Sequence, residues 1–151
     1  MISKKTKYAL NALTYLARHH QEGPVLISAI AKSERIPQKF LEQILLDLKN
    51  NGILQSKKGK GGGYFLGRPA QEIMLGKVVR IFDGPLAPVS CVSQTAYMKC
   101  EECRDDTCCG IRMVMKDVRD AISNILDKTS LADSLRLGDE AVKNKAMNFI
   151  I

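Results

Sequence analysis

Residues 36–67 read IPQKFLEQILLDLKNNGILQSKKGKGGGYFLG, and this stretch decides the fold. A helix is predicted over 37–50, because Pro37 stands at a first helical position, which tolerates its missing N–H, and Asn51-Gly52 supplies a stop. Helical spacing places five apolar residues on its buried side: Phe40, Leu41, Ile44, Leu45 and Leu48. The opposite side of this helix is polar and free to meet a partner.

A shorter helix is predicted just before this one. It covers residues 27–32, turns Ile27, Ile30 and Ala31 inward, and is joined to the next helix by the polar turn Ser33-Glu34-Arg35. Two helices joined by a short turn form a helix-turn-helix candidate. A first helix, capped by Ser3 and running to about His20, carries an apolar stripe of Ala9, Leu10, Leu13, Leu16 and Ala17.

A β-hairpin is predicted after the helix pair. Two short strands, residues 53–56 and 64–67, flank the flexible basic turn KKGKGGG, and a hairpin in this place is a wing. The glycine run fits neither nucleotide-binding template, because Gly61 follows Lys60 where Ser or Thr is needed and Tyr64 replaces the third glycine of the dinucleotide fingerprint. We therefore predict a mainly α fold, a winged helix-turn-helix with a small β-hairpin wing and a long C-terminal helix.

The excess positive charge lies in the first half of the chain. The net charge is +7, but residues 1–70 hold twelve Lys and Arg against four Asp and Glu, whereas residues 71–151 hold eleven against twelve. This distribution suits a polyanion-binding module joined to a neutral one, although a solvated basic surface with an ordinary helical hairpin would also fit. Major-groove reading needs polar side chains at a helix start, and lysines suit phosphates or a narrow minor groove. The candidate DNA-binding residues are Gln38, Lys39, Glu42, Gln43, Lys57, Lys58, Lys60 and Tyr64.

All five cysteines fall in one segment, residues 85–110, which has no usable periodicity and is predicted to be a loop. Their spacing is Cys91-x8-Cys100-x2-Cys103-x4-Cys108-Cys109. Thiolates in one flexible loop can converge on an iron–sulfur cluster or on zinc. A disulfide scaffold would spread its cysteines, and a redox dithiol would need a βαβ context. Idle reduced thiols and a thiol/disulfide switch remain as alternatives.

A long amphipathic helix is predicted from residue 111 onward. Its near-heptad seam, of the kind that packs against a partner helix, comprises Ile111, Val114, Met115, Val118, Ala121, Ile122, Ile125 and Leu126. We expect a winged-helix DNA-binding domain, a cysteine-rich sensing loop, a dimerisation helix and a weaker tail, over 1–84, 85–110, 111–135 and 136–151. With no apolar run of ~20 residues and no secretory signal, we expect a cytoplasmic homodimer with no membrane contact.

Catalysis is not indicated by any residue pattern. The sequence has no Ser/His/Asp arrangement, paired carboxylate site or activated nucleophile, and His19 and His20 are expected to be structural residues at a helix end. A metal-dependent or redox enzyme built on the cysteine loop would need a general base and a substrate cleft. We therefore expect a non-enzymatic protein.

These motifs resemble the bacterial winged-helix repressors that include the iron–sulfur-assembly, nitric-oxide and cysteine-metabolism regulators. The resemblance is carried by KYALNALTYLA (7–17), ISAIA (27–31), IPQKFLEQILLDLKNNGIL (36–54), SKKGKGGGYFLGRPAQEI (56–73), IRMVMKDVRDAISNIL (111–126) and SLADSL (130–135). It implies a homodimer with crossing C-terminal helices, a recognition helix in the major groove and a basic wing residue in the minor groove. On matching positions these contacts fall to Lys39, Phe40, Glu42, Gln43 and Lys58.

The resemblance also implies a 2Fe–2S or 4Fe–4S cluster held by three loop cysteines and a fourth ligand. The matching cysteines are Cys91, Cys103 and Cys109; Cys100 is an additional thiol that would complete an all-cysteine set, and Cys108 is a spare. Where some relatives offer an acidic ligand from the first helix, this chain has Lys7, which cannot serve. The expected function is a repressor of transcription that senses redox state, iron–sulfur status or nitric oxide. The alternative is a regulator with structural zinc or a thiol/disulfide switch and no cluster.

Overall fold

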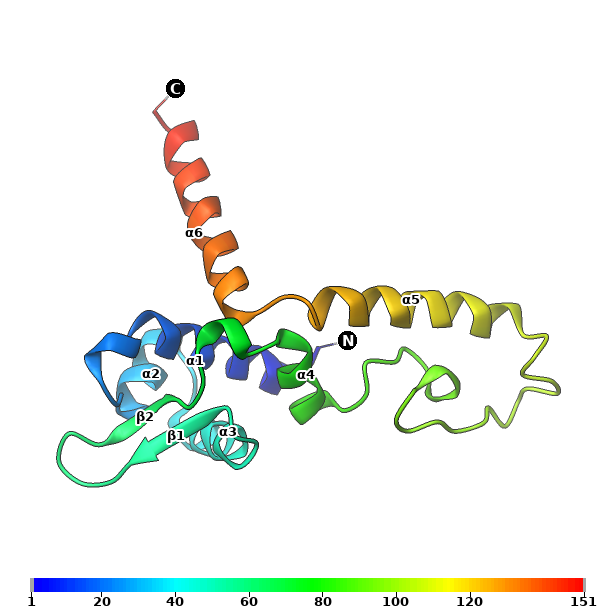
Figure 1. The fold of residues 1–151 in the computed structure, drawn as a ribbon, viewed down its shortest axis with the longest axis horizontal. Helices are drawn as coiled ribbons and strands as arrows, with labels where there is room; N and C mark the ends of the chain where they lie inside the picture. The colour runs from blue at the N-terminus through cyan, green and yellow to red at the C-terminus, as the bar shows by residue number, and fades with distance from the viewer. Residues whose placement is uncertain (1, 151) are drawn as a thin grey trace.

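The computed structural model describes residues 2–150, and residues 4–83 form its winged-helix body (Figure 1). The elements of the body, in chain order, are α1 (Lys4–Arg18), η1 (His20–Glu22), α2 (Ile27–Glu34), α3 (Gln38–Asn50), β1 (Leu54–Lys57), β2 (Gly63–Leu66), η2 (Ala70–Glu72) and α4 (Leu75–Asp83). The η elements are single 3₁₀ turns. The predicted mainly α fold with a two-stranded antiparallel hairpin is confirmed.

Local chemistry sets the boundaries of the first helices. Ser3 caps α1 as predicted, and its hydroxyl accepts the Thr6 N–H at 3.2 Å. Arg35 ends α2 in the left-handed conformation, with φ 54°, which redirects the chain into α3. Pro37 is the N-cap of α3, whereas the sequence had predicted it to be the first helical residue. Its ψ of 127° is extended, and its carbonyl accepts the first hydrogen bond of the helix, from the Leu41 N–H.

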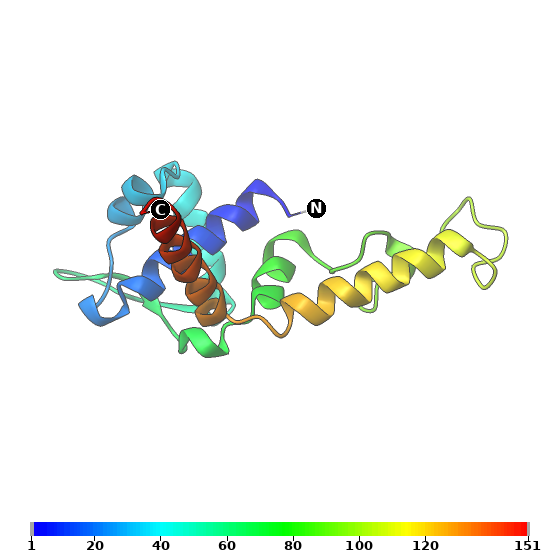
Figure 2. The same ribbon diagram turned by 90° about the horizontal axis from the view of Figure 1, so that it is seen from above.

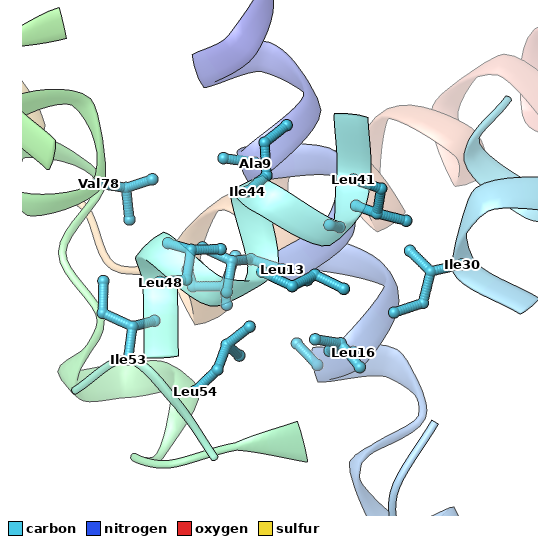
Figure 3. Close-up of a cluster of buried hydrophobic side chains, with 14 of the residues drawn as sticks. Ala9, Leu13, Leu16, Ile30, Leu41, Ile44, Leu48, Ile53, Leu54 and Val78 are labelled. Carbon is cyan, nitrogen blue, oxygen red and sulfur yellow. The ribbon is translucent and has the colours of Figure 1, made fainter. Parts of the chain in front are cut away.

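The core of the body lies where α1, α3 and the start of the hairpin meet (Figure 3). Its fully buried members are aliphatic, and burying each Leu, Ile or Val side chain contributes roughly 1.5–3 kcal/mol. The expectation that Phe40 is buried was wrong, because Leu41 and Ile44 fill the core positions and leave Phe40 at the rim, 43% exposed. There its ring meets Tyr8 edge-on, with 5.8 Å between the ring centroids.

The wing is fixed to the body at its root. Strand β1 pairs with β2 from Leu54 opposite Leu66 to Lys57 opposite Gly63. Val25, in the link between α1 and α2, exchanges two backbone hydrogen bonds of 2.8 Å with Tyr64. A Cβ on Gly63 would lie only 2.3 Å from the Val25 carbonyl oxygen, so this close approach of two backbones requires glycine.

Beyond α4 the chain leaves the body and returns along a second path (Figures 1 and 2). Residues 84–109, including the short turn η3 (Ser90–Val92), run outward beside α5 (Gly110–Leu126), which leads back. Helix α5 contains no buried residue. At its inner end, Arg80 of α4 donates to Asp127 at 2.9 Å and ties α5 to the body.

The chain ends in a further helix, α6 (Leu131–Asn148), which projects from the body (Figure 1). Only a weaker tail was expected here from the sequence, and the expected boundary between residues 135 and 136 falls inside this helix. Ser130 and Asp133 form a capping box, and buried Leu131 seats the first turn. Among residues 2–150, no helix combines the length and the apolar character that crossing a membrane would require.

Candidate DNA-binding surface and cysteine cavity

The exposed side of α3 carries the polar groups predicted to read DNA. Gln38 Nε2 donates to Glu42 Oε1 at 3.4 Å, and Gln43 Nε2 donates to Asp47 Oδ1 at 2.9 Å. These i to i+4 contacts hold donors and acceptors in defined places along the helix. Five predicted residues are exposed together at the start of this helix: Gln38, Lys39, Phe40, Glu42 and Gln43.

The hairpin tip is a separate basic surface. Lys57, Lys58 and Lys60 are all exposed, and the described structure gives none of them an ion-pair partner. Gly59 and Gly61 turn the chain with φ of 87° and 73°, values that side-chain-bearing residues rarely adopt. Free lysines on a narrow hairpin can approach phosphates closely.

Tyr64 lies at the root of the wing and not at its tip. It is half-buried, packs against the hydrophobic core and pairs with Ser56 across the hairpin. Its backbone is engaged with Val25. This position gives Tyr64 a structural role in seating the wing, and a DNA contact by its side chain stays a prediction.

Four of the five cysteines surround one cavity of about 490 Å³ at the outer end of α5. Cys109 is the N-cap of α5, and its sulfur accepts the Arg112 backbone N–H at 3.4 Å. The cysteines that line the cavity are the four predicted as ligands: Cys91, Cys100, Cys103 and Cys109. Cys108 is exposed and does not line it.

The thiols in this cavity influence one another. Withdrawal from water, a hydrogen bond with Cys109 and the nearby Cys109 and Cys100 sulfurs raise the pKa of the Cys103 thiol. Cys103 Sγ donates to the Asp105 carbonyl at 3.4 Å. Glu102 and Asp106 also line the cavity. Two acidic residues thus lie beside the four cysteines.

Two arginines of α5 hold the cysteine loop in place. Arg112 Nε donates to the Cys91 carbonyl at 3.2 Å, and its Nη1 donates to the Asp106 carbonyl at 3.4 Å. Arg119 Nη1 donates to the Val92 carbonyl at 2.6 Å. One guanidinium therefore links both ends of the cysteine segment to the helix that follows it. Periodicity gave no sign of this role, because it depends on how the loop folds back.

The root of the cysteine loop is anchored to α1. Asp83 Oδ2 accepts the Ser3 N–H at 2.9 Å and the Thr6 hydroxyl at 2.7 Å. Burial raises the pKa of the Asp83 carboxyl, but the hydrogen bonds from Ser3 and Thr6 outweigh it and hold the pKa below its usual range. Because Gly84 and Pro85 follow directly, this carboxylate fixes where the loop leaves the body.

The cavity fits a sulfur-ligated group in donor type and in location. Four thiols in one loop are the ligand set that iron–sulfur clusters and zinc accept. Within residues 2–150, however, no three His, Cys, Asp or Glu side chains are yet placed to hold a metal ion. Ligation would therefore require the loop to close further around the cavity.

A helix-turn-helix with a basic wing, joined to a cysteine loop and a long exposed helix, defines a class of DNA-binding transcription regulators. The chain belongs to the Rrf2 family, whose sequence model, described as an iron-dependent transcriptional regulator, matches residues 2–136. This confirms the family resemblance noted in the sequence.

Proteins named as transcriptional regulators are similar to this chain over most of its length. The chain is 39% identical to an rrf2-like HTH-type regulator of Rhodobacter capsulatus, covering 95% of this chain and 97% of that one. It is 33% identical to CymR of Bacillus subtilis, over 87% of each chain, and 33% identical to IscR of Pectobacterium atrosepticum, over 95% and 80%. All three are named as transcriptional regulators, a non-enzymatic role.

Solved structures confirm the fold. The structure of CymR, the global cysteine regulator of B. subtilis, matches with a TM-score of 0.76 at 31% identity, covering 91% of this chain and 97% of that one. The structure of T. potens IscR matches with a TM-score of 0.73 at 28% identity, covering 93% and 90%. The protein is thus a winged-helix transcription regulator of the Rrf2 family.

Proposed function

We propose that the protein is a homodimeric repressor whose affinity for duplex DNA is controlled by an iron–sulfur cluster in the cysteine cavity. The observation that carries this proposal is that Cys91, Cys100, Cys103 and Cys109 line one cavity at the end of α5. When bound, such a cluster supplies a redox-active group whose charge and integrity respond to electron transfer, iron supply or nitric oxide.

The DNA contacts are proposed to come from α3 and the wing. Exposed Gln38, Lys39, Glu42 and Gln43 suit base edges in the major groove, and the hairpin lysines suit phosphates or the minor groove. Phe40 is close enough to the same helix start to contact a thymine methyl group. The exposure of these groups and the concentration of positive charge in the first half support this assignment.

A homodimer through α5 is supported by its exposed apolar seam. The large side chains on this seam recur at intervals of three and four residues and range from 37% to 73% exposed: Ile111, Val114, Val118, Ile122 and Ile125. A seam of this kind packs against a second helix with the same pattern. Pairing two copies would place two recognition helices at a fixed spacing, which determines the spacing of DNA half-sites.

The residues around the cavity provide a route from ligand to DNA. Cys109 caps α5, and Arg112 links α5 to the Cys91 carbonyl, so closing the loop on a ligand would act on the start of the dimer helix. A changed packing of α5 would alter the distance between recognition helices. A coupling free energy of only about 1–3 kcal/mol would produce a regulated change in affinity.

A thiol switch is the second candidate function, favoured by the position of Cys103 and Cys109 at the same cavity. Both thiols would lose a proton and an electron to a peroxide, which would be reduced to water while a disulfide forms. Structural zinc on the same four sulfurs is the remaining form of this alternative.

The decisive experiment is anaerobic purification followed by visible absorbance and analysis of iron, sulfide and zinc in one sample. The proposal predicts a coloured protein with stoichiometric iron and sulfide, and loss of the absorbance in each serine variant of the four cavity cysteines. Cys108→Ser is the matched control and should keep the cluster. A colourless protein that contains zinc, or that forms a disulfide reversibly, would refute the cluster and support the second candidate function.

DNA binding is tested on the same samples by anisotropy of labelled duplexes at fixed salt. The cluster-bound and cluster-free forms should differ in operator affinity by roughly 5- to 150-fold, the range that corresponds to typical coupling energies. Equal affinities under matched salt would refute control by the cluster while leaving the DNA-binding assignment intact.

A further inference from the structure

Asp47 lies on α3 between the predicted DNA-reading side and the first helix. Its Oδ1 accepts Gln43 Nε2 at 2.9 Å, and its Oδ2 accepts Lys5 Nζ at 2.9 Å. The Lys5 ammonium is also 5.2 Å from the centroid of the Phe82 ring on α4. One carboxylate therefore connects an exposed residue of the recognition helix with two elements of the body.

This contact has a chemical consequence for the Gln43 amide. An ionised carboxylate only accepts hydrogen bonds, whereas the end of a glutamine carries an NH₂ donor and a carbonyl acceptor. The Gln43 NH₂ group must therefore face Asp47, and its Oε1 must point elsewhere. The hydrogen bond from Lys5, together with that from Gln43, outweighs the effect of burial and holds the pKa of Asp47 low.

We propose that Asp47 is a positioning residue that sets base preference by fixing the orientation of Gln43. This rests on the proposed function, in which α3 enters the major groove. With one N–H held by Asp47, Gln43 offers Oε1 and its second N–H, the pair of groups that matches N6 and N7 of adenine. Asp47 thereby selects adenine at the base pair that Gln43 meets.

Lys5 has a distinct part in this arrangement. A carboxylate on a DNA-facing helix repels phosphates, and the Lys5 ammonium neutralises it at a distance of 2.9 Å. Removing the ammonium should therefore weaken binding to all sequences alike and leave the amide orientation unchanged. Removing the carboxylate should instead change which base is preferred. The two substitutions thus give different results if Asp47 acts through Gln43.

The test is selection of bound sequences from a randomised duplex library by the full chain, at one salt concentration. Wild type should prefer adenine at one position in each half-site by about five- to a hundredfold, as one bidentate contact would give. Asp47→Asn keeps the shape of the side chain, but its amide can donate as well as accept, so the Gln43 amide is free to flip. The preference for adenine should therefore fall at least about threefold. Gln43→Ala should lose it, and adding D47N to Q43A should change it no further.

Controls separate the possible failures. Glu72→Gln removes an exposed acid outside α3 and should leave all preferences unchanged, whereas Lys5→Met should lower affinity without altering them. A wild-type chain that selects no sequence would contradict the proposed function itself. A selective wild type whose preferences survive D47N would overturn only the role of Asp47. Folding is checked by circular dichroism, and Asp47→Ser repeats the test if D47N does not fold.

Discussion

Replacing Thr6 by valine should weaken the attachment of the cysteine loop to α1 while conserving side-chain volume. Thr6 is fully buried, and its hydroxyl donates to Asp83 Oδ2 at 2.7 Å. Because the acceptor is a carboxylate, the free energy of unfolding should fall by about 1.5–3 kcal/mol. For a chain of this length, that loss lowers the melting temperature by roughly 3–12 °C.

The same substitution should change the dependence of stability on pH. The pKa of Asp83 is held below its usual range in the folded state, so its stabilisation is present at neutral pH. It is lost as pH falls from about 5 through the ordinary carboxyl range toward the depressed folded value. Thr6→Val removes one of the hydrogen bonds responsible and should therefore lose less stability on acidification than wild type.

Urea unfolding followed by circular dichroism, at one protein concentration and at neutral and acid pH, measures both effects. Thr14→Val is the matched control, because the Thr14 hydroxyl donates only to the Leu10 carbonyl within α1, and it should cost less than about 1 kcal/mol. A T6V protein as stable as wild type, or with an unchanged pH dependence, would refute the reasoning.

Three other predictions follow from the fold. Gly63→Ala should lower the free energy of unfolding in urea by about 1–3 kcal/mol, because the new Cβ would meet the Val25 backbone. Gly110→Ala is the control and should not lower it, because the space around Gly110 is open. Leu48→Ala should cost about 2–5 kcal/mol, and Leu46→Ala, at an exposed position of the same helix, less than about 1 kcal/mol. Replacing the three wing lysines, Lys57, Lys58 and Lys60, by alanine should reduce the slope of log affinity for DNA against log salt concentration by about 2.7. An unchanged slope would count against contact of these lysines with phosphates.

Much of the body could be predicted because its signals are local. The stripe of α1, the Ser3 cap and the stop at Gly52 each depend on residues within one or two helical turns. The wing was also predictable, because a glycine-rich turn between two short stretches that contain apolar residues is typical of a β-hairpin. Phe40 was misplaced because periodicity assigns a face, and the depth of each position depends on the neighbouring elements.

Helix α6 was missed for the opposite reason. Its apolar positions are diluted by polar residues and by Gly138, so no continuous stripe is visible in the sequence. The local signal that existed was the Ser130 to Asp133 capping box. The helix is held on the body by long-range contacts such as Arg18 to Asp139, at 2.8 Å, which no sequence pattern indicates.

In the candidate sites, the sequence located residues but not their partners. The cysteine spacing identified the loop, and the structure brings the four predicted thiols to one cavity. The contacts of Arg112 with the Cys91 carbonyl and of Asp47 with Gln43 were not predicted from the sequence. The contact of Gln43 with Asp47 has readable helical spacing, but the ion pair of Asp47 with Lys5 spans 42 residues and depends on how α1 crosses α3.

The length of α5 determines how a movement at the cysteine cavity affects the DNA-binding body. Seventeen residues place the cavity about 25 Å from the inner end of the helix, where Arg80 and Asp127 attach it to α4. Over this length, a displacement of about 2.5 Å at the cysteine end corresponds to a rotation of roughly 6° of the helix axis. A movement at the cavity is therefore transmitted to the attachment at the inner end, where Arg80 pairs with Asp127 and the Leu75 N–H donates to the Thr129 carbonyl at 3.0 Å.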